Sequence, residues 1–293
     1  MLKLYASMFI IIYGLVGFSQ TNGNIMVYSS FGKVELKNGN TTIQVKPYDQ
    51  LSLQSILFFS KNSKLYFINS DQKMFVFSKP GKYPVSKIIA SVKSSTGELS
   101  NAMSLITHHF IEKGKFYHGK TIFSTAGLVT RGSEPKLMLF PINNSVILND
   151  YKINPIFNST EIDTSDQLSI DLMVNDNLKH TFLYKPGASI QLPNHLRSSD
   201  KVFLRINHKN FTQSIGLVFA TEKEKNTARK DLLELANNFK STEELLFSKA
   251  LYYESKGFYI DALNCYNKLL EEYKNNSTYN EQKNAFLNDV IIQ

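Results

Sequence analysis

The segment that most constrains the fold is residues 245–273, LLFSKALYYESKGFYIDALNCYNKLLEEY, which Gly257 divides into two halves. In each half, apolar residues recur at i, i+4 and i+7, a spacing that places side chains on one face of a helix. These residues are Leu246, Ala250 and Tyr253 in the first half and, sixteen positions later, Ala262, Tyr266 and Leu269 in the second. The segment therefore predicts two amphipathic helices, joined by a tight turn, with alanines where the backbones approach closely.

Small residues at the crossing of a helical hairpin, with large ones around them, resemble the tetratricopeptide repeat. With Glu243 as the first position, about 34 residues match this family, although Leu246, Leu269 and Lys274 stand where Trp, a small residue and Pro are usual. The resemblance implies an all-α unit that binds protein partners and performs no chemistry. A single repeat cannot bury a core, so the helical segments 228–239 and 279–291 are expected to be degenerate repeats or caps.

In that family, the first helix of each repeat lines a concave groove. Carried over position by position, the resemblance implies that Glu244, Phe247, Leu251 and Glu254 form the partner-binding groove. An apolar centre flanked by carboxylates suits an extended or helical peptide. The alternative is that the preceding helix, near residues 232–239, packs on the groove and fills it.

Residues 1–19 read as a signal peptide, because Lys3 precedes an apolar run over residues 8–16 and small residues, Gly17 and Ser19, stand before the expected cleavage point. The run is too short for a transmembrane helix, and no other run approaches that length. We therefore expect an exported chain in the periplasm or cell envelope, with no transmembrane span after cleavage.

Residues 20–95 read as a small β domain, because short apolar strands alternate with turn residues such as Asn38-Gly39. The expected strands cover residues 32–37, 41–45, 64–68 and 74–77. Their order, closed by a G-x-Tyr sequence at Tyr83, resembles the FecR-type β domain of periplasmic sensor proteins. That resemblance implies binding or scaffolding without catalysis.

Residues 96–134 are expected to form a helix, at 99–111, followed by a linker. His108, His109 and His118 raise the question of a metal site there. Adjacent residues on a helix point about 100° apart, and no cysteine lies nearby, so we predict no metal.

Residues 135–221 are expected to form an immunoglobulin-like β-sandwich, since short strands and turns alternate at regular intervals. The expected strands cover residues 136–140, 168–174, 181–184, 189–192, 202–206 and 214–219. With the TPR-like helices of residues 222–293, the predicted fold class is α+β, with several domains. Thr221 with Glu224, and Ser241 with Glu244, form capping-box patterns at the helix starts. The combination resembles a TPR repeat protein of the Gram-negative bacterial envelope.

Charge is uneven along the chain. Residues 61–136 hold 12 basic and 4 acidic residues, whereas residues 222–293 hold 10 basic and 12 acidic ones. The basic part could bind a polyanionic or cell-wall ligand. Alternatively, its lysines could simply be scattered over solvent-exposed β surfaces, with no ligand. No nucleic-acid motif accompanies them, and we expect no nucleic-acid partner.

We find no nucleophile elbow, phosphate-binding glycine loop, HExxH or CxxC sequence. The single cysteine, Cys265, is expected to pack in a helix. We therefore predict a non-enzymatic adaptor or scaffold without a cofactor, whose TPR-like hairpin binds unknown protein partners. The alternative is a periplasmic sensor-type protein that binds a carbohydrate or cell-wall ligand through its β domains. Exposed aromatic platforms among Tyr66, Phe75 and Tyr83 would favour that alternative.

Overall fold

The computed structural model describes most of the chain and confirms an α+β fold. The described residues are 25–38, 41–69, 73–92, 101–119, 137–149, 151–157, 168–185, 187–209, 211–239, 241–274 and 276–292. The chain divides into two compact units, Met1–Gly97 and Glu98–Gln293. The predicted signal peptide, the turn at Gly39 and the linker at residues 120–134 lie outside the described residues.

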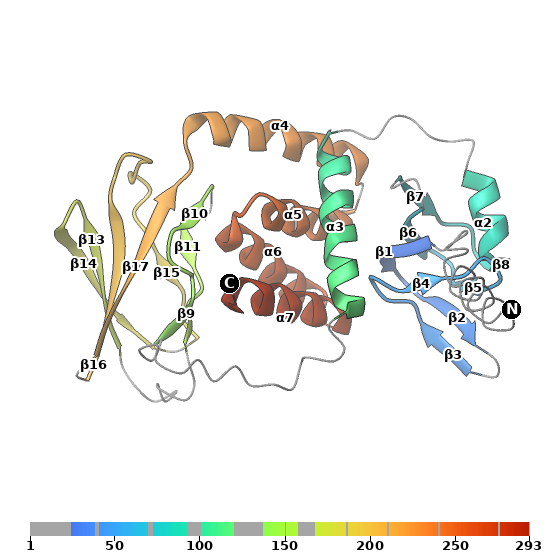
Figure 1. Cartoon of the computed structure of the whole chain (residues 1–293), viewed down its shortest axis with the longest axis horizontal. Coiled ribbons are helices and arrows are strands. Elements are labelled where there is room, and N and C mark those ends of the chain that lie inside the picture. The colour runs from blue at the N-terminus through green and yellow to red at the C-terminus, as the bar shows by residue number, and fades with distance from the viewer. Residues whose placement is uncertain are drawn as a thin grey trace, which may run out of the picture. The chain divides into compact units, whose positions relative to one another are not determined.

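The N-terminal unit contains two four-stranded antiparallel sheets, ordered β4-β1-β6-β7 and β3-β2-β5-β8, and helix α2, Val85–Val92 (Figure 1). The strands are β1 (Ile25–Phe31), β2 (Val34–Asn38), β3 (Thr41–Gln44), β4 (Gln50–Leu51), β5 (Ile56–Phe59), β6 (Lys64–Ile68), β7 (Met74–Phe77) and β8 (Gly81–Pro84). The strands predicted at 64–68 and 74–77 are confirmed. Strands β1 and β5 had not been predicted.

The core of this unit lies between the two sheets, because strands of both sheets contribute inward-facing residues to one buried cluster. Leu57 and Phe59 of β5 meet Leu65 and Phe67 of β6 in one buried cluster, and Ile88 of α2 packs against the same cluster. The intervening residues of these strands therefore face away from the core.

The β part of the C-terminal unit is a five-stranded sheet, ordered β10-β17-β16-β13-β14, with two small two-stranded sheets, β11-β15 and β12-β9. Strand β10 runs parallel to β17, and the other pairs are antiparallel. The strands are β9 (Met138–Phe140), β10 (Ser145–Ile147), β11 (Lys152–Ile153), β12 (Ile156–Phe157), β13 (Leu168–Val174), β14 (Asn177–Tyr184), β15 (Ile190–Gln191), β16 (Val202–His208) and β17 (Phe211–Phe219).

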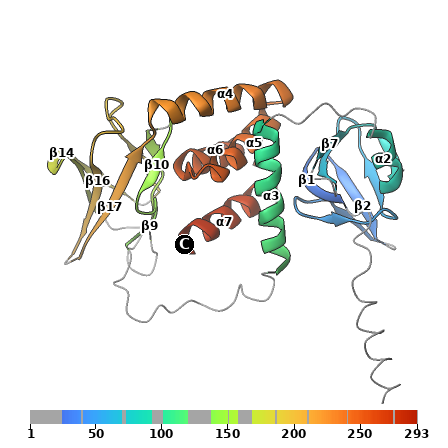
Figure 2. The same ribbon diagram turned by 45° about the horizontal axis from the view of Figure 1, so that its top comes forward.

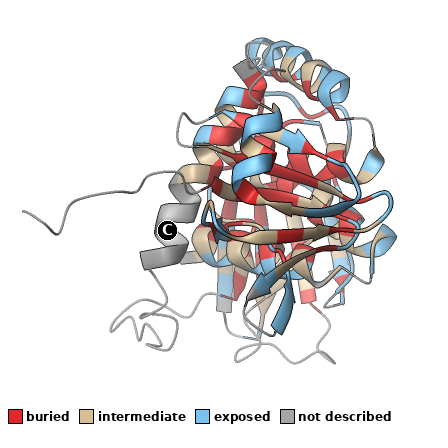
Figure 3. Ribbon diagram, turned by 90° about the vertical axis from the view of Figure 1, so that its right-hand side faces the viewer, coloured by how far each residue is buried: buried red, intermediate tan, exposed pale blue. Residues whose placement is uncertain are grey.

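Five helices complete the C-terminal unit: α3 (Asn101–Gly119), α4 (Glu222–Asn238), α5 (Thr242–Ser255), α6 (Tyr259–Glu272) and α7 (Ser277–Ile292). Helix α3 includes residues 101–111 of the helix predicted at 99–111, but it packs against α4 and α5 and so forms part of the helical layer (Figures 1 and 2). Helix α4 leads from β17 to α5, and most of its residues are exposed, as Figure 3 shows at the top of the view.

The helix boundaries follow the local sequence signals. The capping box at Thr221 is confirmed: its hydroxyl accepts a hydrogen bond from the Glu224 amide, and the Glu224 carboxylate accepts one from the Thr221 amide at 2.8 Å. The hydrogen bonds from Thr221 lower the pKa of Glu224. At the start of α5, the Ser241 hydroxyl accepts a hydrogen bond from the Glu244 amide at 3.2 Å, which is the N-cap half of the predicted pattern. Between α5 and α6, Gly257 adopts a φ of 77°, which glycine accepts without a steric penalty.

Helix α6 is attached to the β part by two polar side chains three positions apart, which therefore share a face of the helix. The Asp261 carboxylate is 3% exposed and accepts hydrogen bonds from the amides of Leu148, at 3.0 Å, and Asn149, at 3.2 Å. Asn264 donates to the carbonyl of Lys152 at 2.8 Å. These bonds make the helices and the sheets one compact unit.

We predict that Asp261→Ala destabilises the C-terminal unit by about 2–3 kcal/mol, because two buried amides lose a charged acceptor. Urea unfolding of the full chain, followed by circular dichroism, measures the change. Glu272→Ala on the same helix is the matched control, since Glu272 forms only an exposed pair with Lys268; it should change stability by less than about 0.5 kcal/mol. Equal effects of the two substitutions would contradict this role for Asp261.

Candidate functional site

The four residues predicted to line a partner-binding groove all lie on α5, and none of them is exposed. Glu244 is 2% exposed, Glu254 is 5% exposed, and Phe247 and Leu251 are almost fully buried. The chain's own residues therefore cover the predicted groove in this structure. Nothing in the geometry brings the four side chains to a surface that a partner could reach without moving another helix.

Glu254 is held by residues from two neighbouring helices. The Tyr266 hydroxyl of α6 donates to one carboxylate oxygen at 2.5 Å, and the His109 Nε2 atom of α3 lies 3.3 Å from the other. A buried carboxylate is costly unless it is hydrogen-bonded. The position that the resemblance assigned to partner binding thus serves to join α3, α5 and α6.

Two further tyrosines bind carboxylates across helix contacts. The Tyr252 hydroxyl of α5 donates to Asp231 of α4 at 2.8 Å. The Tyr279 hydroxyl of α7 donates to Glu243 of α5 at 2.7 Å. Burial raises the pKa of both tyrosines, and the neighbouring carboxylates raise it further. The Tyr279 ring also packs on Phe247, with centroids 5.8 Å apart, so α7 covers part of the predicted groove.

The apolar residues predicted to form the helical hairpin are buried, as two closely packed helices require. Helices α5 and α6 contact one another along their length, and the six apolar positions are buried. These are Leu246, Ala250, Tyr253, Ala262, Tyr266 and Leu269. The flanking segments are helical as predicted, in α4 and α7. Cys265 is half-buried on α6.

Of the three histidines near residue 108, the structure describes the side chains of His108 and His109. His109 is directed to Glu254, and the side chain of His118 lies outside the described residues. Among the residues that the structure describes, no group of three or more His, Cys, Asp or Glu side chains could hold a metal ion.

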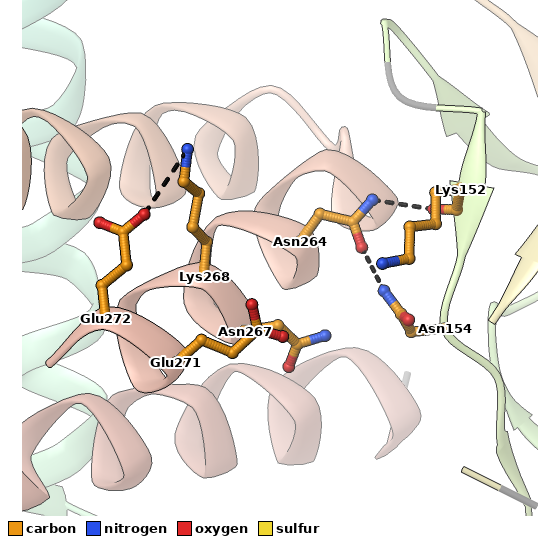
Figure 4. A pocket seen from close by; sticks show the side chains of 7 residues that line it. All are labelled: Lys152, Asn154, Asn264, Asn267, Lys268, Glu271 and Glu272. Carbon is orange, nitrogen blue, oxygen red and sulfur yellow. Dashed lines mark hydrogen bonds and ion pairs between the residues drawn. The ribbon is translucent and has the colours of Figure 1, made fainter. Parts of the chain in front are cut away.

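A polar cavity of about 250 Å³ lies between α6 and the segment around β11 (Figure 4). Asn264 forms its inner wall, fixed by the Lys152 carbonyl and by the Asn154 amide group at 2.5 Å. Two lysines and two glutamates are among the lining residues, and Lys268 pairs with Glu272 at 3.8 Å. The cavity carries no aromatic side chain and no net excess of either charge. Its lining is Lys152, Asn154, Asn264, Asn267, Lys268, Glu271 and Glu272.

The N-terminal unit has a very different surface. Its described residues include nine lysines and only two carboxylates, Glu35 and Asp49. Both carboxylates have internal partners, because Glu35 pairs with Lys33 at 2.9 Å and Asp49 accepts from the Lys46 amide at 2.8 Å. Eight of the lysines are exposed: Lys33, Lys37, Lys46, Lys61, Lys73, Lys79, Lys82 and Lys87. This surface is the strongest concentration of one charge in the described residues.

The aromatic residues proposed as a sugar platform are not exposed. Tyr66 is buried, and Phe75 and Tyr83 are half-buried against the core. Phe75 stacks on Phe67 with centroids 5.7 Å apart, and Tyr83 meets Phe77 edge-on at 5.0 Å. These three side chains form part of the packing of the unit.

The sequence matches no family model and no curated protein. Across the described residues, no helix has the length and apolar character that a membrane span requires. The resemblances to the TPR, FecR-type and immunoglobulin-like families therefore stay predictions.

The tyrosine–carboxylate pairs predict a specific response to alkaline pH. Unfolded tyrosines ionise near pH 10, whereas the raised pKa keeps Tyr252 and Tyr279 neutral in the folded chain. The unfolded state therefore loses protons first, and the free energy of unfolding falls as pH rises above about 10. We expect a loss of about 0.8 kcal/mol for each tyrosine at about pH 10.5.

Urea unfolding at neutral pH and at the alkaline pH measures this loss. The control is the double variant Tyr252→Phe/Tyr279→Phe, which begins less stable but should lose less stability between the two pH values. A double variant whose loss equals that of the unmodified chain would contradict the assignment to these two residues.

Proposed function

We propose that this chain is an exported, non-catalytic adaptor that binds an anionic ligand through its N-terminal β unit and uses its C-terminal unit as a scaffold. The observation that carries the proposal is the set of eight exposed lysines on the N-terminal unit, whose two described carboxylates already have internal partners. Unbalanced positive charge on one unit attracts polyanions over distances of about a Debye length. In the periplasm or cell envelope, such ligands are acidic cell-wall or surface polymers.

The non-catalytic part of the proposal is supported by how the buried ionisable groups are used. Glu254 and Asp261 are each held by hydrogen bonds that join elements of the C-terminal unit. Groups arranged for catalysis would converge on a cavity. The polar cavity beside α6 instead offers exposed lysines and glutamates, with Asn264 fixed by structural bonds.

The helical hairpin enters this proposal as a TPR-like scaffold. A protein partner that used Phe247 or Glu254 would have to displace Tyr279 of α7 or His109 of α3, since these side chains cover them. The outer sides of the helices, such as the largely exposed α4, are the surfaces on which a scaffold could hold a protein. The FecR-like β domain then supplies ligand binding, and the immunoglobulin-like sheet links it to the helices in sequence.

The proposal is tested with polygalacturonate, a polymer of acidic sugars, and with neutral dextran. We expect the purified chain to bind polygalacturonate at low salt, to lose at least about tenfold in affinity when salt is raised about sixfold, and not to bind dextran. Isothermal titration calorimetry gives the affinities. Failure to bind any anionic polymer at low salt would overturn the proposal.

Two charge-matched variants show which unit is responsible. The first changes four exposed lysines of the N-terminal unit to glutamine: Lys37, Lys61, Lys73 and Lys82. The second changes four exposed lysines of the C-terminal unit to glutamine: Lys179, Lys185, Lys230 and Lys274. The first should lose about tenfold or more in affinity, and the second less than about twofold. Equal losses would contradict a specific role for the N-terminal unit.

A further inference from the structure

One face of the sheet β3-β2-β5-β8 combines an aromatic ring with cations and hydrogen-bonding groups. Strand β5 lies in the interior of this sheet, between β2 and β8. Its Leu57 and Phe59 point into the core, so Phe58 between them points to the opposite, outer face. Phe58 is half-buried and does not belong to the core cluster between the sheets.

The strand register places four different side chains in one row across this outer face. Phe58 lies opposite Glu35 of β2 on one side and Lys82 of β8 on the other, and Glu35 lies opposite Gln44 of β3. The Lys82 ammonium group is 5.4 Å from the centroid of the Phe58 ring. Neighbouring strands are about 4.8 Å apart, so the row spans roughly 15 Å.

Further lysines stand beside the row. Lys37 lies opposite Ile56 on the same outer face, two positions from Glu35, and Lys33 pairs with Glu35 at 2.9 Å. Among the described residues, neither Lys37 nor Lys82 has a carboxylate partner. The face therefore carries an apolar ring at its centre with the Lys82 ammonium group over it, a second lysine, Lys37, beside it, and a carboxylate and an amide in the same row.

We propose that this outer face is the binding site for an acidic polysaccharide. This assignment rests on the proposed function and specifies the class of its ligand. The apolar face of a sugar ring stacks on Phe58, as flat apolar groups do on aromatic side chains. Lys37 and Lys82 pair with carboxylates of neighbouring sugars. Glu35 and Gln44 hydrogen-bond to sugar hydroxyls.

Hydrogen-bonding chemistry favours an acidic glycan over DNA. The Glu35 carboxylate lies in the row and can accept hydrogen bonds from the many hydroxyl groups of a sugar, whereas a deoxyribose–phosphate backbone has no hydroxyl groups along its length to donate. The lysines would pair as point charges with carboxylates, sulfates or phosphates alike, so the sugar hydroxyl groups are what distinguishes the glycan as a ligand.

The test measures binding of polygalacturonate to the full chain and to substituted chains. Phe58→Ala should weaken binding by about tenfold, because one ring-stacking contact is lost. Phe58→Tyr, which keeps an aromatic ring on the face, should stay within about threefold of the unmodified chain. Unchanged far-ultraviolet circular dichroism and thermal midpoint establish that each variant is folded.

A charge-matched pair of double variants tests the position of the site. Lys37→Gln/Lys82→Gln removes the two cations beside Phe58 and should weaken binding by about tenfold or more. Lys61→Gln/Lys73→Gln removes two exposed lysines next to β6 and β7 of the other sheet and should change it by less than about threefold. Equal losses, or no effect of Phe58→Ala, would overturn the site while leaving polyanion binding by the unit intact.

The nature of the ligand is tested with single-stranded DNA of thymidines as a second probe. Weaker binding to the DNA than to polygalacturonate supports the glycan assignment. Tighter binding to the DNA, lost in Phe58→Ala and in the Lys37→Gln/Lys82→Gln variant, would overturn it in favour of nucleic acid. No binding of the unmodified chain to either polymer would instead reject the proposed function itself.

Discussion

The carboxylate of Asp261 is the single group on which the arrangement of the C-terminal unit most depends. It enters the junction between α6 and the segment after β10, where backbone amides would otherwise have no acceptor, and it takes two of them. A charge that is 3% exposed is tolerable only with such partners. The same condition explains the tyrosines that meet carboxylates between helices. Each pair satisfies a buried group and fixes one helix against another.

This use of polar groups explains why the predicted groove is not open. A helix that borders a groove needs a polar or exposed stripe, but α5 has buried side chains on all sides, including Phe247, Ala250 and Tyr252. The sequence already contained this signal, since LLFSKALYY leaves only Lys249 as a plainly polar position facing water. The resemblance specified where each side chain points around the helix. It could not specify that α3, about 140 residues away in sequence, packs on that side.

The helices were predictable because their signals are local: Thr221 with Glu224, Ser241 with Glu244, and the glycine at 257 lie within a few residues of the ends that they define. Strand β1 was missed because it buries residues on both faces. Strand β5 was missed because its sequence, ILFF, is apolar throughout. Neither shows the alternation of apolar and polar residues by which strands are recognised. The order of strands in each sheet could not be predicted either, because it depends on pairs that are distant in sequence, such as β1 with β6. The candidate glycan site depends on that order, because Glu35, Phe58 and Lys82 meet only across three strands.

Exposed lysines serve two different purposes in the two units. At the sheet edge of the C-terminal unit, β14 exposes Leu183, and a bulge places Lys179 without a partner on β13. A lysine and a bulge at an edge hinder the addition of another strand, so this charge opposes edge-to-edge association of the sheet. In the N-terminal unit, Lys37 of the interior strand β2 and Lys82 of the edge strand β8 lie on one sheet face together with an outward phenylalanine, Phe58. Protection of an edge requires no aromatic ring there. The proposed glycan would displace the Lys82 ammonium group from the half-buried Phe58 ring and cover the part of the ring that is still accessible.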